Sequence, residues 1–214
     1  MDPSSQAKEI PGKTGWFSFN GTGIRSVALN LGTCDPYCNL DVVSALAVQG
    51  DGKLALAGAA SDDAIIAQPM LGRLKVDGSF DTSFHGTGLF SVGTSWPGHG
   101  GMWPAGIAER PDTRELVVAM SYRVSSAAGS PTRQLLTQWS SNGNTLRASR
   151  SFEFTAHASQ IPEAIPQGLL VDSDSAMMVG SRRWDASDWS NRDHDITLVR
   201  TLVDMDFLFS DGFE

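Results

Sequence analysis

Residues 45–58 read ALAVQGDGKLALAG, and residues 167–180 read QGLLVDSDSAMMVG, in step with the first stretch and ending on an equivalent glycine. Residues 105–120, AGIAERPDTRELVVAM, have the same order of apolar run, turn and apolar run. The second half of the unit recurs as LGRLKVDGSFD, LTQWSSNGNTL and, more faintly, LVRTLVDMDFL (71–81, 136–146 and 198–208). A fixed period of about sixty residues indicates an array of similar supersecondary units, so it decides the architecture.

Each unit has the pattern of β-strands joined by hairpins. Residues 43–48 alternate toward a turn that contains Asp51-Gly52, and Asp-Gly is a strong hairpin signal. Residues 54–58 return as a second strand, residues 64–76 give a third strand, and residues 84–92 lead into a fourth. No window shows a sustained helical stripe of apolar residues. The sequence therefore predicts four strands per unit in one antiparallel sheet.

A small sheet with two-residue alternation cannot bury both faces alone, so the units must stack. We therefore expect an all-β, propeller-like array of about three four-stranded antiparallel blades. A β-sandwich is the alternative, although it does not require such similar units. The expected divisions are an N-terminal strand and Cys loop, three blades, and a C-terminal tail included in the third (1–40, 41–104, 105–164 and 165–214).

The two ends of the chain bear on how the array closes. Thr14–Phe19 matches Thr87–Val92, which suggests a fourth strand that lacks the other three of its unit. The third unit stops soon after its third strand, near Phe207–Ser210. Propellers have typically four to eight blades. We therefore expect a partial ring, half of a ring closed by a homodimer, or part of something longer.

Composition excludes some classes of function. The formal net charge is −8 and no Lys/Arg cluster is present, which argues against a nucleic-acid partner. No apolar run approaches the roughly 20 residues of a transmembrane helix. The N-terminus lacks a signal-peptide core, but a composition rich in Gly, Ser, Thr, Asp and Trp favours an exported domain whose leader has been removed.

Cys34 and Cys38 flank a three-residue segment. In an oxidising compartment they would form a local disulfide, and in a reducing one they would remain two unpaired thiols. No second ligand pair for zinc is present.

The first unit carries a run of marker residues: Gln49, Asp51-Gly52-Lys53, Ala57-Gly58, Arg73-Leu74, Asp77-Gly78-Ser79, Asp81, Ser83-Phe84, Gly86 and Gly88. This order is similar to the repeat of the bacterial delta-60 repeat proteins, while the second and third units keep few of these residues. The opening Asp2-Pro3-Ser4 is similar to the start of that family, and Leu208–Glu214 resembles the F-x-D-G-F-E ending of many exported gammaproteobacterial proteins. The resemblance implies a propeller on secreted, periplasmic or cell-surface proteins, and it implies no common chemistry.

Candidate binding residues lie in two aromatic, polar stretches. Trp96, His99 and Trp103 stand in a glycine-rich connector between units, and Trp184 and Trp189 stand in an acidic excursion. Tryptophan rings in such loops can stack on sugars, or they can simply pack the loop. Asp185, Asp188, Asp193 and Asp195 could offer oxygens to calcium, but the EF-hand spacing and a bidentate Glu are absent, so a solvated loop is the better interpretation. No other cofactor is expected.

The sequence offers no catalytic constellation. There is no G-x-S-x-G, Walker A or dinucleotide-binding glycine motif. The leading hypothesis is a non-catalytic module that binds a protein or ligand through the long loops at 60–69, 123–133 and 182–195. The alternative is a propeller enzyme that acts on a glycan or polysaccharide at the central opening, for which fold alone is weak evidence. Small apolar inner strands favour the binding module.

Overall fold

A computed structural model describes residues 19–27, 41–61, 67–92, 101–127, 129–154, 162–183 and 194–203. These residues form β-strands and turns, with no helix among them. Blade 1 consists of β1 (Asp41–Val48), β2 (Leu54–Ser61), β3 (Ala67–Leu74) and β4 (Leu89–Ser91). Blade 2 consists of β5 (Met102–Glu109), β6 (Leu116–Arg123), β7 (Thr132–Trp139) and β8 (Leu146–Phe152). Blade 3 consists of β9 (Glu163–Val171), β10 (Ser175–Arg183) and β11 (His194–Leu202).

Pairing within each blade is antiparallel and follows chain order. Blade 1 is a four-stranded sheet, β1-β2-β3-β4. Blades 2 and 3 form a seven-stranded sheet, β11-β10-β9-β7-β6-β5, with β8 on the outer side of β7. The join between β7 and β9 is one parallel pair, Thr132 with Glu163, so the seven-stranded sheet is two blades that meet at a corner. The expected all-β, propeller-like array is confirmed, and its ring is not closed.

Tight turns close the hairpins where the sequence places Asp-Gly or Asn-Gly. Gln49 and Gly52 make backbone hydrogen bonds across the first turn of blade 1, and the turn after β3 is closed by Lys75 and Ser79. In blade 2 the turn after β7 is closed by Ser140 and Thr145. Such turns match the twist of antiparallel strands and hold each pair in register.

The core lies between the blades. Each blade has a leading face, toward the preceding blade, and a trailing face, toward the following one. Ala57 and Leu71 on the trailing face of blade 1 pack with Val118 and Leu135 on the leading face of blade 2. The trailing face of blade 2 packs in the same way on the leading face of blade 3. Since burial of apolar area drives folding, the contact between neighbouring blades stabilises each of them.

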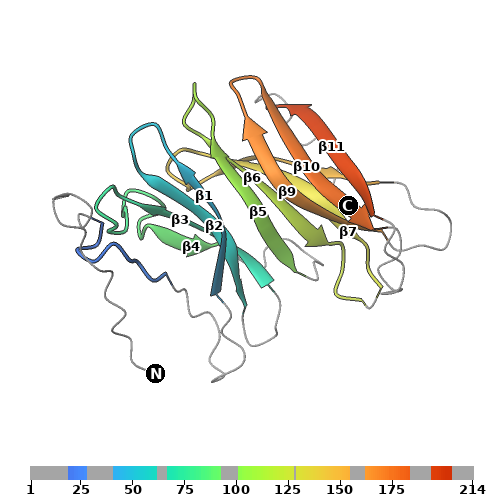
Figure 1. The fold of residues 1–214 in the computed structure, drawn as a ribbon, viewed down its shortest axis with the longest axis horizontal. Helices are drawn as coiled ribbons and strands as arrows, with labels where there is room; N and C mark the ends of the chain where they lie inside the picture. The colour runs from blue at the N-terminus through green and yellow to red at the C-terminus, as the bar shows by residue number, and fades with distance from the viewer. Residues whose placement is uncertain are drawn as a thin grey trace, which may run out of the picture.

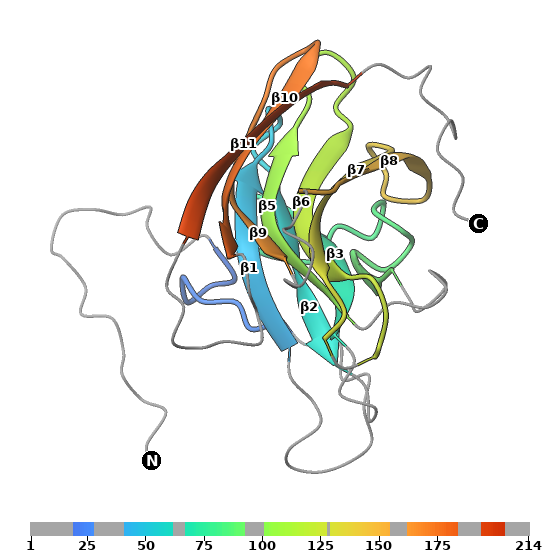
Figure 2. The same ribbon diagram turned by 90° about the vertical axis from the view of Figure 1, so that its right-hand side faces the viewer.

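The inner strands β1, β5 and β9 lie near one another, and the rest of each sheet fans outward (Figures 1 and 2). The tight hairpins β1–β2, β5–β6 and β9–β10 share one end of the array, at the top of Figure 1. The ends of β2, β6 and β10 share the opposite end. The loops predicted at 60–69, 123–133 and 182–195 all start and finish at that opposite end, which is called the loop end below.

The N-terminal segment that resembles the fourth strand of blade 1 matches it in a different register from the expected one. Phe19–Gly23 has the backbone of Phe84–Gly88: Asn20 and His85 both have φ of 50°, and Gly23 N donates to Phe19 O as Gly88 N donates to Phe84 O. Each segment lies 65 residues from the other along the chain. The expected match of Thr14–Phe19 to Thr87–Val92 was therefore out of step, because both stretches contain Thr-Gly and an aromatic residue.

Both copies of this segment dock on the following blade. His85 N donates to Asn142 O at 2.8 Å, and Asn20 N donates to Asp77 O at 2.5 Å. A Cβ on Gly143 would meet the ring of Phe84 at 2.6 Å, and Gly143 has φ of +74°. Glycine is required there, because the turn needs a positive φ and the ring leaves no room for a side chain.

Candidate functional site

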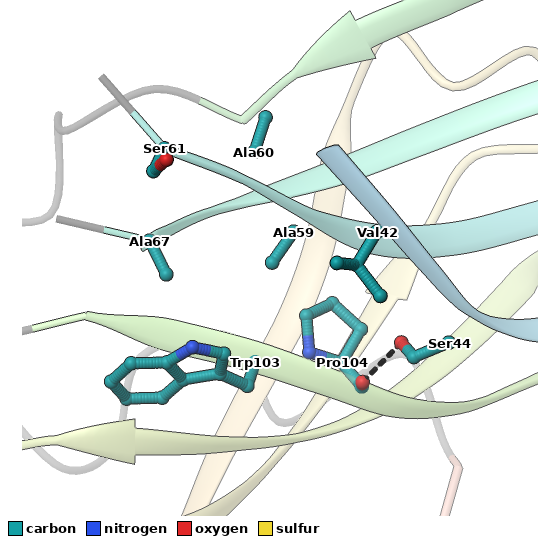
Figure 3. Close-up of a pocket in the computed structure, with 8 residues that line it drawn as sticks. All are labelled: Val42, Ser44, Ala59, Ala60, Ser61, Ala67, Trp103 and Pro104. Atoms are coloured by element: carbon teal, nitrogen blue, oxygen red, sulfur yellow. Dashed lines mark hydrogen bonds between the residues drawn. The ribbon is translucent and has the colours of Figure 1, made fainter. Parts of the chain in front are cut away.

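A pocket opens at the loop end, between blades 1 and 2 (Figure 3). Its volume is about 160 Å³. The strands β1, β2, β3 and β5 each contribute to its wall. The lining residues are Val42, Ser44, Ala59, Ala60, Ser61, Ala67, Trp103 and Pro104. A cavity of about 150 Å³ can hold a benzene-sized group, so this pocket suits one ring or one branched side chain.

Small side chains on β2 and β3 make the hollow. Ala59 and Ala67 stand where a larger residue would fill the space beside Trp103. Trp103 leaves β5 with a partly exposed indole, and that ring lies against Gly101, where a Cβ would come within 2.6 Å of it. This close approach holds the indole at one wall of the pocket.

A hydrogen bond between the two blades fixes the inner wall. The Ser44 hydroxyl donates to the backbone carbonyl of Pro104 at 2.5 Å. Pro104 has no N–H, so its carbonyl is the group that β5 offers at this point. Ser44 also stands at the irregularity in the β1–β2 register, between Val43 and Ala45. The bulge turns the hydroxyl out of the sheet and toward the next blade.

The chemistry of the wall is apolar. Among the eight lining residues there is no Asp, Glu, His, Lys, Arg or Cys. These residues therefore offer no general acid, general base or charged nucleophile. An aromatic ring beside alanine, valine and proline instead favours the burial of an apolar group.

The predicted binding residues fall in different places. Trp103 lines the pocket, and its role in binding stays a prediction. Trp96, His99, Trp184 and Trp189 lie outside the described residues. The same holds for Cys34 and Cys38. The sequence did not reveal Ser44, Ala59 or Ala67, because small residues in strands carry no signal until two blades are packed together.

The expected calcium site is described only at Asp195. Its carboxylate pairs with Arg182, Nη2 to Oδ2 at 3.3 Å. Asp185, Asp188 and Asp193 lie outside the described residues. Within the part of the chain that the structure describes, no group of three His, Cys, Asp or Glu residues could hold a metal ion.

The strongest charge cluster lies away from the pocket and ties blade 1 to blade 2. Arg73 Nε donates to Asp81 Oδ2 at 2.8 Å, and Lys53 Nζ lies 3.2 Å from the same oxygen. Burial alone would raise the pKa of Asp81, but hydrogen bonds from Ser83 and Lys53 and the charge of Arg73 hold that pKa well below its usual range. Arg73 Nη1 also donates to Ser141 O in blade 2 at 2.6 Å.

Two further side chains make equivalent links at the hairpin end. Glu109 in blade 2 accepts from Gln49 Nε2 at 2.9 Å and from Gly50 N at 2.7 Å in blade 1. Arg110 in blade 2 donates to Val203 O at 2.8 Å and to Ser173 O at 2.5 Å in blade 3. Hydrogen bonds to charged groups are stronger than neutral ones, so these contacts hold neighbouring blades in place. Their role is structural.

Comparison with known proteins adds no family. No family model matches the chain, and a search of curated proteins gives no match. Among the described residues, no helix is long and apolar enough to span a membrane.

Proposed function

We propose that this chain is a non-catalytic β-propeller repeat module that binds a protein partner through the loop end. The observation that carries the proposal is the pocket beside Trp103, which is apolar and has no ionisable lining residue. An apolar side chain of the partner would enter the pocket, and the surrounding loops would contact the rest of the partner. The repeat pattern and the composition further support an exported module of the delta-60 type.

An apolar side chain fits this wall better than a sugar does. A sugar ring needs hydrogen-bond partners for its hydroxyls as well as an aromatic face, because an unpaired buried hydroxyl costs free energy. The lining side chains offer only two hydroxyls, and the Ser44 hydroxyl already donates to Pro104. A leucine or phenylalanine side chain needs no such partner and would stack on Trp103.

The test uses small model compounds and the full chain. N-acetyl-phenylalanine amide and N-acetyl-leucine amide are titrated at millimolar concentration, and the indole N–H signal of Trp103 is followed by NMR. A Trp103→Phe variant assigns this signal among the six tryptophans. We expect the signal to shift and to saturate with either amide. Methyl glucoside, as the sugar probe, should leave it unchanged.

The three other outcomes each decide against the proposal as stated. A saturating shift with methyl glucoside alone would replace the protein partner with a glycan. An unchanged Trp103 signal with all three compounds would remove the pocket as a binding site. A shift that persists in an Ala67→Leu variant, in which the added side chain fills the pocket, would place the compounds elsewhere.

A further inference from the structure

Blade 3, the last described blade, exposes its trailing face. The trailing faces of blades 1 and 2 are buried against the blade that follows. On the trailing face of blade 3, Val179 and Leu198 form a cross-strand pair and are 43% and 66% exposed. The equivalent pair in blade 2, Ala119 and Leu136, is 0% and 5% exposed because blade 3 covers it. The trailing face of blade 3 therefore has the composition of a contact between blades, but none of the described residues forms a blade on it.

The opposite end of the array exposes the complementary surface. Leu46 on β1, at the leading face of blade 1, is 57% exposed, whereas its equivalent Ile107 in blade 2 is 7% exposed. Val48 is exposed beside it, while Leu56 and Met70, further out on the same face, are already buried within one chain. The inner strand β1 therefore offers exposed apolar side chains for a contact at this end of the array.

The outer edge of blade 3 carries no fourth strand among the residues that the structure describes. In blade 1 the third strand pairs with β4, Gly72 opposite Leu89, and in blade 2 it pairs with β8. Among the described residues β11 pairs only with β10. An open edge presents unpaired N–H and C=O groups and is a template for a further strand.

The segment that fits this edge is present at the other end of the chain. Residues 18–27 read SFNGTGIRSV, and residues 83–92 read SFHGTGLFSV. Ile24 is therefore the equivalent of Leu89, the residue of β4 that lies opposite Gly72. Segment 19–27 thus behaves as the fourth strand of a blade that precedes blade 1, and it is already docked on the turn of blade 1 through Asn20.

We propose that two copies of this chain close one six-bladed ring. Residues 24–26 of each copy pair with the outer edge of β11 in the other, with Ile24 opposite Val199. Leu170 of blade 3, which is exposed, packs against Leu46 of the second copy. The trailing face of blade 3 in each copy contacts the leading face of blade 1 in the other. Two such contacts complete the ring.

One polar side chain of blade 3 is also placed to donate a hydrogen bond across the contact between the two copies. Arg200 in blade 3 is the equivalent of Arg73, whose Nη1 donates to Ser141 O of the following blade. Within the described residues, Arg200 Nε makes one long contact, 3.4 Å to Ser175 Oγ. The equivalent of Ser141 in blade 1 is Val76, which is exposed. Arg200 can therefore donate to the Val76 carbonyl of the second copy.

Closure within one chain does not fit the geometry. Segment 19–27 lies beside blade 1 and β11 lies at the far side of blade 3, at opposite ends of the array (Figure 1). The described residues form three blades, which is below the usual range of four to eight, and a second copy would bring the number to six. The second copy thus supplies both the missing strand and the missing neighbour.

The first measurement is the solution mass by light scattering at several protein concentrations. We expect twice the 22.9 kDa of one chain. Leu170→Asp and Leu46→Asp should each shift the mass to that of a monomer, since an acid would be buried in the contact. Ser126→Asp, in the middle blade and exposed, should leave the dimer unchanged. A monomer at every concentration, or a series of larger species, overturns the two-copy ring.

A cross-link tests the strand pairing itself. Two proteins are prepared with Cys34 and Cys38 replaced by Ser, one carrying Ile24→Cys and the other Val199→Cys. The equivalent pair in blade 1 does not share backbone hydrogen bonds, and such pairs bring side chains close. On mild oxidation the mixture should give a disulfide-linked heterodimer. Arg25→Cys is the control. Its side chain points to the other face of the strand, so this variant should not form the disulfide with Val199→Cys. Absence of the link between folded proteins overturns the pairing.

Discussion

Replacing Asp81 with asparagine should lower the free energy of unfolding by about 3 to 5 kcal/mol near neutral pH, because it removes one partner of a buried ion pair. The Asp81 carboxylate is almost fully buried and accepts hydrogen bonds from Arg73, from the Ser83 hydroxyl and from Ser83 N. Lys53 Nζ lies 3.2 Å from it as a second cation. The asparagine would leave the buried guanidinium without its counter-ion.

The loss should extend to the contact between blades. Arg73 also donates to Ser141 O, and its guanidinium lies 4.9 Å from the centre of the Phe84 ring. A displaced Arg73 would therefore weaken both the hydrogen bond to blade 2 and the packing of the segment that docks on it. For a chain of this size, each kcal/mol corresponds to about 2 to 4 °C in the melting midpoint.

The pH dependence of this effect has a definite sign. The folded-state pKa of Asp81 is lowered, so its stabilisation is fully present above the unfolded pKa of about 3.9. The stabilisation is lost progressively as the pH falls below that value toward the folded pKa. The difference in stability between the wild type and Asp81→Asn should therefore be constant from pH 5 to 7 and shrink between about pH 4 and pH 2.

Urea unfolding followed by circular dichroism at a series of pH values measures this difference. Asp112→Asn is the matched control, because Asp112 also pairs with an arginine, at 3.0 Å from Arg110 Nη2, but is exposed. The control should cost less than about 1 kcal/mol. A loss below about 1 kcal/mol for Asp81→Asn at pH 7, or a loss that does not change down to pH 2, would refute the reasoning.

Three further substitutions probe the turn, the link to blade 3 and the pocket. Gly143→Ala should destabilise by about 1 to 3 kcal/mol in urea unfolding, because it places a Cβ at positive φ against Phe84; an unchanged midpoint would show that the ring can move. Arg110→Gln should lower the free energy of unfolding by about 1 to 3 kcal/mol, because it leaves the Val203 carbonyl without its donor. A loss below a few tenths of a kcal/mol would contradict the role of Arg110 as a link between blades 2 and 3. Ala59→Leu should abolish the NMR shift seen with N-acetyl-phenylalanine amide while the melting midpoint stays near that of the wild type; retained binding would exclude the pocket.

Much of the fold was open to prediction because its signals are local. Asp51-Gly52 and Asn142-Gly143 mark hairpins through their own backbone preferences, and the repeat period places those hairpins in equivalent blades. The register of the N-terminal segment could not be predicted from local signals in this way. Asn20 and His85 share their positive φ because each docks on the turn of a following blade, and that contact spans more than fifty residues.

The candidate site was predictable only in part. Trp103 stood out as an aromatic residue in a glycine-rich connector. The rest of the pocket comes from Ala59 and Ala67, and alanine in a strand has the same sequence signal whether it borders a hollow or packs tightly. The hollow results from the distance between two blades, so it becomes visible only when the packing is known.

The docking of Phe84 on Gly143 also has a consequence for how the chain folds during synthesis. The segment that completes blade 1 has its binding place on the turn of blade 2, which leaves the ribosome later. Blade 1 therefore cannot reach its final stability when its own last residue has emerged, and must wait for residues 142 and 143. We therefore expect the smallest stable fragment to run from the start of one blade to the turn after the third strand of the next. Truncations placed at the edges of blades should be less stable than truncations placed after such a turn.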